Sequence, residues 1–397
     1  MEQRRFSGKG HWYHETQSST GQAQALPLVP EAATVNDRFL LDLVLPEDVI
    51  APCQGWLDPA RMLYDRLFPR CVSVSRLRTF SAYDRLSTAL TVAQVYGVQR
   101  LCNHYAARLA PLPGPDSSRE SNHRLAQITQ YARQLASSPE VIDARAREQL
   151  EEVGLTTWDI VLMDQIIGFI GFQARVIAAF QALLGQPVRW LPGMEMQQDA
   201  AAEPFINQQS RWTAGLECVE LHLASAPQLE ALAQWQPLPA LQVLTPVLAH
   251  EHHLLNALGA VLQSDMCDML DASLVDLVAL LTARINGSLD CFNTLATPAV
   301  PETLLAALRS DEQALNAWSQ ADPQARAVIQ AVQLLTRAAD RFSAAQFTPL
   351  VEQGLSPQQA INLLAWSGLC GWLNRLKIAL GDTHWRETAL DAPPRIA

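Results

Sequence analysis

The residues best suited to chemistry are Ser288 and Cys291, which follow a break between two expected helices. An apolar helical pattern ends at Asn286 and Gly287, and a new helix is expected to begin near Ser288. With Ser288 as the N-cap, Cys291 stands at the third helical position, where the positive end of a helix lowers the pKa of a thiol. A thiolate at this position could attack a peroxide and become a sulfenic acid.

The neighbouring side chains allow both a catalytic and a structural interpretation. Asp276 lies on an otherwise apolar helix, so it needs a partner or water, and we expect Arg284 or Arg375 to be that partner. Ser288 has no base near it in the sequence, which favours a cap over a nucleophile. Cys291 could equally be a small apolar core residue that happens to follow the cap.

The elements that would hold these residues belong to an internal repeat. Residues 152–175 match residues 352–375 without a gap at a constant offset of 200, which indicates two copies of one helical unit. Each matched stretch ends in an arginine, Arg175 in the first and Arg375 in the second. We expect a structural ion pair at each, with the anchoring of an anionic substrate as the alternative. The identical residues are Glu152, Gly154, Leu155, Gly168, Gly171 and Arg175, which recur as Glu352, Gly354, Leu355, Gly368, Gly371 and Arg375.

Four glycines of the repeat are interpreted as positions where two helix backbones approach closely: Gly168, Gly171, Gly368 and Gly371. The first copy has fewer reactive groups than the second. When Cys102 is aligned with Cys291, no carboxylate, second thiol or imidazole falls at the corresponding positions, and His104 receives a supporting role only.

A histidine cluster at residues 250–253 is the remaining candidate for ligand chemistry. His250 and His253 would share one helix face, but the pattern is not the H-E-x-x-H of zinc enzymes. We therefore expect a helix start here and no metal site.

The periodicity predicts an all-α protein of two repeated units. The expected divisions are a flexible N-terminal arm (1–34), a first domain (35–185), a linker that packs (186–240), a second domain (241–383) and a tail (384–397). Part of the linker, residues 212–223, is expected to be helical.

Composition narrows the classes of partner. The net charge of −11 over 397 residues argues against binding to nucleic acid or to an anionic membrane. The apolar window 160–184 is interrupted by polar residues, so we expect a buried helix there and no membrane span. Seven scattered cysteines without a C-x-x-C pair indicate free thiols in a reducing compartment, and with no secretory signal the cytoplasm is the expected location.

Residues 271–296 resemble the core of the AhpD-like family, which includes alkylhydroperoxidases, peroxidase-related proteins and carboxymuconolactone decarboxylases. The redox-active members carry Glu-x11-Cys-x2-Cys-x3-His, and the same frame here reads Asp276, Ser288, Cys291 and Leu295. Residues 243–255, which include His250, and residues 374–381 also look like the flanking helices of the family. The resemblance implies two tandem AhpD-like helical domains arranged pseudosymmetrically, no cofactor and a homo-oligomer.

Three functions remain open from the sequence. The first is a cofactor-free oxidoreductase, in which Cys291 reduces a hydroperoxide and an external thiol or a distant cysteine resolves the sulfenic acid, because Ser288 cannot form the disulfide of the family. The second is a decarboxylase-like lyase that binds an anionic metabolite, which a cavity lined by His104, Arg175 or Arg375 would favour. The third is a non-catalytic binding or scaffold protein, which a buried, inert Cys291 would favour.

Overall fold

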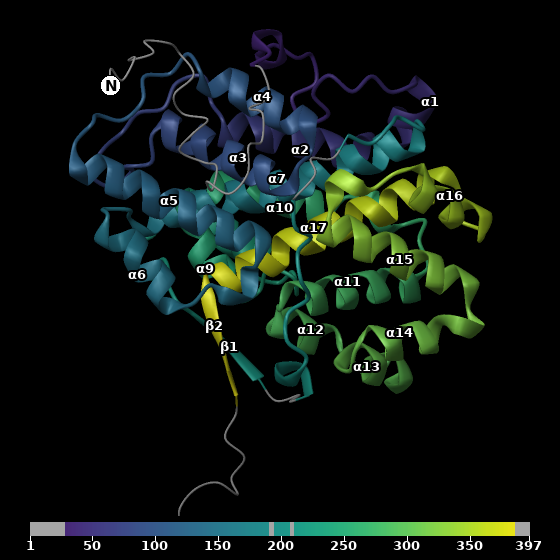
Figure 1. Cartoon of the computed structure of the whole chain (residues 1–397). Helices are drawn as coiled ribbons and strands as arrows, with labels where there is room; N and C mark the ends of the chain where they lie inside the picture. Colours follow the sequence, from purple (N-terminus) through teal and green to yellow (C-terminus); the bar gives the residue numbers. More distant parts are fainter. Residues whose placement is uncertain (1–27, 190–193, 207–209, 386–397) are drawn as a thin grey trace, which may run out of the picture.

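The computed structural model describes residues 28–189, 194–206 and 210–385. In these ranges the protein is mostly α-helical, as predicted, with one antiparallel two-stranded sheet (Figure 1). The helices up to the end of the first copy are α1 (Glu47–Ile50), α2 (Gln54–Leu67), α3 (Ala82–Tyr96), α4 (Gln99–Leu109), α5 (Arg119–Ser137), α6 (Ala144–Glu152) and α7 (Thr157–Leu183).

The remainder of the chain is also helical apart from its two strands. It comprises β1 (Ser210–Ala214), α8 (Ala226–Trp235), α9 (Thr245–Leu248), α10 (His252–Leu262), α11 (Ala272–Asn286), α12 (Leu289–Leu295), α13 (Glu302–Arg309), α14 (Glu312–Trp318), α15 (Pro323–Arg337), α16 (Ala344–Glu352), α17 (Pro357–Ala379) and β2 (Gly381–Trp385).

The repeated sequence forms the same local structure twice. Gly154 and Gly354 have φ angles of 87° and 105°, a left-handed conformation that ends α6 and α16 and that other residues rarely adopt. Two residues later, Thr156 and Ser356 each form a capping box that starts α7 or α17. The repeated Gly-Leu-Thr/Ser sequence is therefore a turn followed by a helix start.

Helices α7 and α17 pack along each other at the centre of the molecule (Figure 1). Their contacts are reciprocal: Gly168 leaves room for the ring of Trp372, and Gly368 for Phe172. A Cβ on Gly168 would lie 1.8 Å from the Trp372 ring, whereas a Cβ on Gly368 would lie 3.2 Å from Phe172. The prediction of close helix contacts at these two glycines is confirmed.

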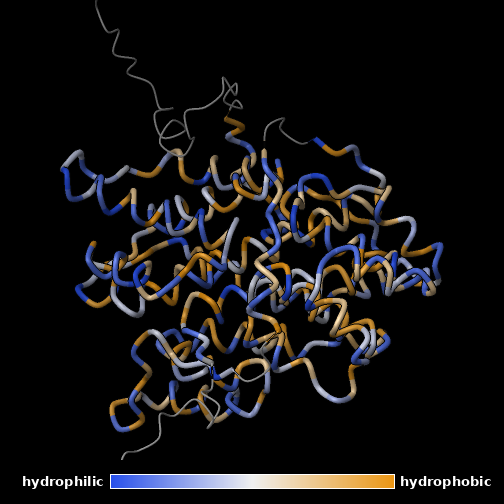
Figure 2. Tube along the Cα trace, turned by 60° about the horizontal axis from the view of Figure 1, so that its bottom comes forward, coloured by the Kyte–Doolittle hydropathy of each residue, from blue (hydrophilic) through white to orange (hydrophobic). Residues whose placement is uncertain are grey.

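One continuous hydrophobic cluster extends through both copies. Most helices alternate hydrophobic and hydrophilic residues along the chain (Figure 2), as helices with one face in a core require. Helix α7 alone among the described helices is long and apolar enough to span a membrane, but 89% of its most apolar window is buried inside the protein. It is the buried core helix that the sequence predicted. The division into two pseudosymmetric domains stays a prediction.

Other expectations were wrong or need new boundaries. Residues 212–223 are not helical, since Trp212 lies in β1, which pairs with β2 at the end of the second copy. The linker packs as expected, because Trp212 and Trp235 are both buried; Trp190 lies outside the described residues. Residues 28–34 of the expected arm include a 3₁₀ turn, η2 (Pro30–Ala33), which packs on α4.

Candidate functional site

Cys291 is the third residue of α12, as the sequence predicted. Ser288 occupies the N-cap position, but its side chain makes no capping hydrogen bond. The thiol lies near the Ser288 hydroxyl, the Asn374 amide and the Lys377 ammonium group, all of which lower its pKa. Burial acts against them and is the larger effect, so the pKa of the Cys291 thiol is raised overall.

Two residues near Cys291 were not predicted from the sequence. Lys377 is buried and forms an ion pair with Asp290, and Asn374 accepts a hydrogen bond from the Asn286 amide. The counterparts of Asn374 and Lys377 in the first copy are the apolar Ala174 and Ile177. This replacement of apolar by polar residues at buried positions of the repeat is the signal that could have identified them.

Asp276 and the Cys291 thiol lie at different places along α17. The carbonyl of its neighbour Val275 accepts a hydrogen bond from Trp366, whereas Cys291 lies near Asn374. Trp366 and Asn374 are eight residues apart on α17, about 12 Å along the helix. Asp276 forms no ion pair within the described ranges, and burial raises the pKa of its carboxyl.

The two partners expected for Asp276 donate hydrogen bonds to backbone carbonyls instead: Arg284 and Arg375. Arg284 donates hydrogen bonds to the carbonyls of Leu308 and Ala200. The expectation of an Asp276 ion pair with either arginine is wrong, because both guanidinium groups are used to satisfy buried carbonyls.

Arg175 and Arg375 cap helices of the opposite copy. Arg175 donates to the carbonyl of Thr336 at the end of α15, and Arg375 donates to Ala136 at the end of α5, both over 2.8 Å. Both guanidinium groups lie over the ring of Tyr96, at 4.7 and 5.8 Å. Neither forms the predicted ion pair, since cations near the last carbonyls of a helix satisfy the negative end of the helix dipole instead.

His104 is buried and both of its ring nitrogens are engaged. Nδ1 donates to the carbonyl of Ala32 and Nε2 accepts from the Tyr64 hydroxyl, each over 2.7 Å. Burial lowers the pKa of His104 to about 4, which keeps the imidazole neutral. The hydrogen bonds of the His104 side chain thus connect η2 and α2 to α4, which is a structural role.

Cys102 is held as a neutral thiol. Burial raises its pKa to about 12, and the carboxylate of Asp340 contributes to the increase. The structure also shifts its alignment by one residue. Because Gly97 and Gly287 both end their helices in the left-handed conformation, Cys291 corresponds to Leu101 and not to Cys102.

His250 precedes α10 in a 3₁₀ turn, η6 (Ala249–Glu251), so it does not share a helix with His253 as expected. Its Nε2 bonds with the carbonyl of Glu217 over 2.8 Å. Among the residues that the structure describes, no group of three or more His, Cys, Asp or Glu side chains is placed to hold a metal ion.

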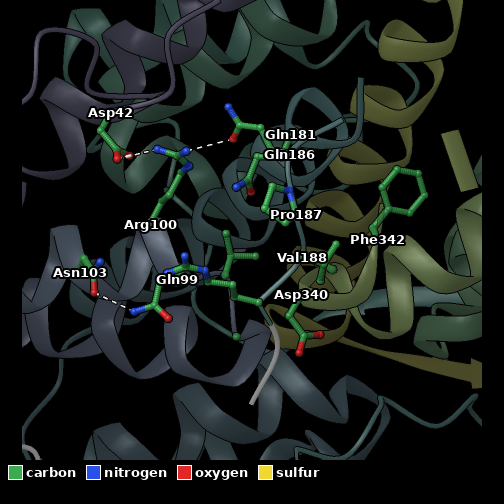
Figure 3. A pocket seen from close by; sticks show the side chains of 14 residues that line it. Asp42, Gln99, Arg100, Asn103, Gln181, Gln186, Pro187, Val188, Asp340 and Phe342 are labelled. Carbon is green, nitrogen blue, oxygen red and sulfur yellow. Dashed lines mark hydrogen bonds and ion pairs between the residues drawn. The ribbon is translucent and has the colours of Figure 1, made fainter. Parts of the chain in front are cut away.

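A cavity of about 380 Å³ lies beside the α3–α4 break of the first copy, and we call it the first-repeat cavity. Its walls come from the start of α4, from the chain after α7 and from the 3₁₀ turn η9 (Ala339–Arg341) with its flank in the second copy (Figure 3). Eight of its fourteen lining residues are charged or amide-bearing: Asp42, Gln99, Arg100, Asn103, Gln181, Gln186, Arg189 and Asp340.

Most of these polar groups are already oriented by one another. Arg100 forms an ion pair with Asp42 and donates a hydrogen bond to Gln186 over 3.0 Å. Gln99 donates to Asn103 over 3.0 Å (Figure 3). A wall of fixed polar side chains can recognise a small polar molecule, because the donors and acceptors need little further ordering.

The equivalent break in the second copy is filled by the linker. The backbone N–H of Ala200 donates to Ile285 over 3.0 Å, and the Gln197 amide donates to Asn286 over 2.9 Å. A Cβ built on Gly287 would lie 2.8 Å from Glu140 and 3.0 Å from Ala200. Glu140 and the linker residue Ala200 therefore lie directly against Gly287.

The chain matches no family model and no curated protein. The resemblance to the AhpD-like family therefore rests on the residues named above, and its functional consequences are proposals.

Proposed function

We propose that the protein binds a small polar molecule in the first-repeat cavity. The observation that carries this proposal is the contrast between the two helix breaks, of which the first is hollow and lined by polar groups. At about 380 Å³ the cavity lies within the usual range of small-molecule sites. This favours the binding interpretation of the sequence over the two enzymatic ones.

The groups required for the lyase do not line the cavity. His104, Arg175 and Arg375 are absent from its walls and from those of three further cavities formed by described residues. Each is instead bonded to backbone carbonyls. No observation favours the lyase, and it is not proposed further.

Isothermal titration calorimetry with a panel of small molecules tests the binding function. The panel contains succinate, sorbitol, butyrate, butylammonium and 4-aminobutyrate, which differ in charge and in hydroxyl content. Val188, which is partly buried in the cavity wall, is replaced in the variant Val188→Trp to fill the space. Val243→Trp, at a partly exposed position outside the cavity, is the matched control.

We expect at least one probe to bind the natural protein and the Val243→Trp variant, and to bind Val188→Trp at least tenfold more weakly. Failure of every probe to bind at millimolar concentration would overturn the proposal, as would equal binding by Val188→Trp.

A second candidate is the cofactor-free thiol oxidoreductase, with a hydroperoxide as substrate and an external thiol as reductant. Lys377, Asn374 and Ser288 favour it, because all three lower the pKa of the Cys291 thiol against the effect of burial. The Cys291 thiolate would attack the peroxide O–O bond, so that an alcohol leaves and a sulfenic acid forms. Two external thiols would then reduce the sulfenic acid, with release of water and a disulfide.

Intact-mass analysis after brief exposure to tert-butyl hydroperoxide and dimedone tests this candidate. Rapid addition of one dimedone that Cys291→Ser abolishes would support it. Cys71→Ser, at an exposed cysteine, serves as the control and should leave the labelling unchanged. Slow labelling that Cys291→Ser does not alter would remove the oxidoreductase from consideration.

A further inference from the structure

The first-repeat cavity contains two charged residues that are not paired with each other. Asp42 and Arg100 form an ion pair, which leaves Asp340 and Arg189. Neither of these two makes an ion pair with a residue in the described ranges. The cavity wall therefore carries one carboxylate and one guanidinium group without a salt-bridge partner.

Asp340 is the more unusual of the two. Its Oδ2 atom is buried and has no hydrogen-bond partner within the described chain. Backbone N–H groups of its own turn and the charge of Arg341 favour the ionised form, yet burial outweighs them and raises the pKa of the carboxyl. Oδ2 lies against Gly97, and the carboxyl group has no ion-pair partner in the described chain, so an ammonium group in the cavity would supply that partner.

Arg189 is exposed and belongs to the chain segment after α7, which also lines the cavity. A guanidinium group presents several donors in one plane, which suits a carboxylate. The same cavity is also lined by three neutral amides, Gln99, Gln181 and Gln186. An amide has both a donor and an acceptor, so it can bind either the ammonium or the carboxylate end of a ligand.

We infer that the first-repeat cavity binds a small zwitterion, an amino acid or another ammonium carboxylate, with its ammonium group at Asp340 and its carboxylate at Arg189. This inference rests on the proposed binding function and specifies the ligand class. The charges of such a ligand match the two unpaired groups, and its zero net charge matches a cavity with two acidic and two basic residues.

Three probes of similar length separate the contributions of the two charges. 4-Aminobutyrate carries both groups, butyrate only the carboxylate and butylammonium only the ammonium. We expect calorimetry at pH 7 to show 4-aminobutyrate binding at least tenfold more tightly than either single-charge probe.

Two variants test which protein side chain binds each charged end of the ligand. Asp340→Asn should weaken 4-aminobutyrate and butylammonium about tenfold and leave butyrate unchanged, whereas Arg189→Gln should weaken 4-aminobutyrate and butyrate only. Glu140→Gln, at the residue that occupies the equivalent position in the first copy, is the matched control and should not alter binding. Arg189 is exposed, so its variant tests the inference even if Asp340→Asn proves unstable.

Tighter binding of butyrate, butylammonium, succinate or sorbitol than of 4-aminobutyrate would overturn the inference while the binding function stood. An equal loss in Glu140→Gln and Asp340→Asn would also overturn it. If no probe binds at all, the binding function itself fails.

Discussion

The two helix breaks differ in what fills the space beside them. Gly97 and Gly287 have φ angles of 68° and 79°, and each is covered by an acidic side chain of the opposite copy, Asp340 or Glu140. The linker occupies the second break through Gln197 and Ala200, whereas the first remains hollow. The repeat thus preserves the backbone frame at both breaks, while unrepeated residues decide which break is available to a ligand.

Ser288 and Cys291 lie at the filled break. Cys291 has polar neighbours there, but burial raises the pKa of its thiol. The hollow break has Leu101 in the corresponding position, and burial raises the pKa of the adjacent Cys102 thiol to about 12. The better placed thiol and the cavity therefore lie at different breaks, and this is the reason that binding is proposed before thiol chemistry.

The largest expected difference between the copies concerns the central helix pair. Gly168→Ala should destabilise the protein by about 3 kcal/mol or more, because the new methyl group would overlap the Trp372 ring. Gly368→Ala should change stability by no more than about 1 kcal/mol, since the contact with Phe172 is looser and alanine favours a helix.

Urea unfolding followed by circular dichroism measures both variants. Equal losses in the two glycine variants would show that the copies pack alike and that the tight contact at Trp372 is not a real asymmetry.

The two buried arginines provide the second comparison. Arg375→Met should cost about 3 kcal/mol, because it removes the side-chain donor to the carbonyl of Leu135 and the shorter of two such donors to Ala136. Arg175→Met should cost less, about 2 kcal/mol, since only Thr336 in the opposite copy loses a bond. Thermal unfolding of both variants gives the order, and a greater loss in Arg175→Met would contradict it.

The third comparison concerns pH, because the first copy buries a histidine where the second has the exposed Thr294. The pKa of His104 is about 4 in the folded protein and about 6.5 when unfolded. The unfolded chain binds the proton more readily, so the stabilisation is present above pH 6.5 and is lost as the pH falls toward 4. Between pH 7 and 5 the loss should be about 2 kcal/mol.

His104→Gln keeps a donor and an acceptor but does not titrate, so it should flatten the dependence of unfolding free energy on pH in this range. Thr294→Ala is the matched control and should preserve the slope of the natural protein. An unchanged slope in His104→Gln would mean that other groups cause the acid sensitivity.

Local structure was predictable where neighbouring residues determine it. The place of Cys291 in α12 depends on a few adjacent residues, and this prediction agrees with the structure. The partners of the arginines were not predictable, since they are carbonyls more than 100 residues away in the sequence. Residue type alone does not distinguish a carboxylate partner from the end of a helix.

The candidate site was less predictable than the fold for the same reason. The first-repeat cavity combines residues from four separate segments, and a helical sequence pattern does not reveal how such segments meet. Asp276 and Cys291 lie in one sequence frame, but the carbonyl of Val275 beside Asp276 and the Cys291 thiol lie at different turns of α17. The homo-oligomer and the cytoplasmic location stay predictions of the sequence.

The smallest expected effect tests whether the linker is what distinguishes the breaks. Gln197 donates to Asn286, Asn286 donates to Asn374, and Asn374 lies at the Cys291 thiol. Gln197→Ala should cost about 1 kcal/mol of stability, because it removes the bond to Asn286 and a longer one accepted from Arg375 over 3.3 Å, and should raise the rate at which Cys291 reacts with a thiol reagent severalfold. Mass spectrometry of the labelled peptide measures that rate.

Gln198→Ala is the matched control, because the side chain of Gln198 is exposed and donates to the carbonyl of Met196, away from Asn286. If both variants leave the rate at Cys291 unchanged, the linker does not shield the second break, and the contrast with the first-repeat cavity must arise from the two helix ends themselves. If only Gln197→Ala accelerates labelling, the linker is the element that covers the second break. Without the Gln197 side chain a small reagent would reach both breaks, although the residues beside them still differ.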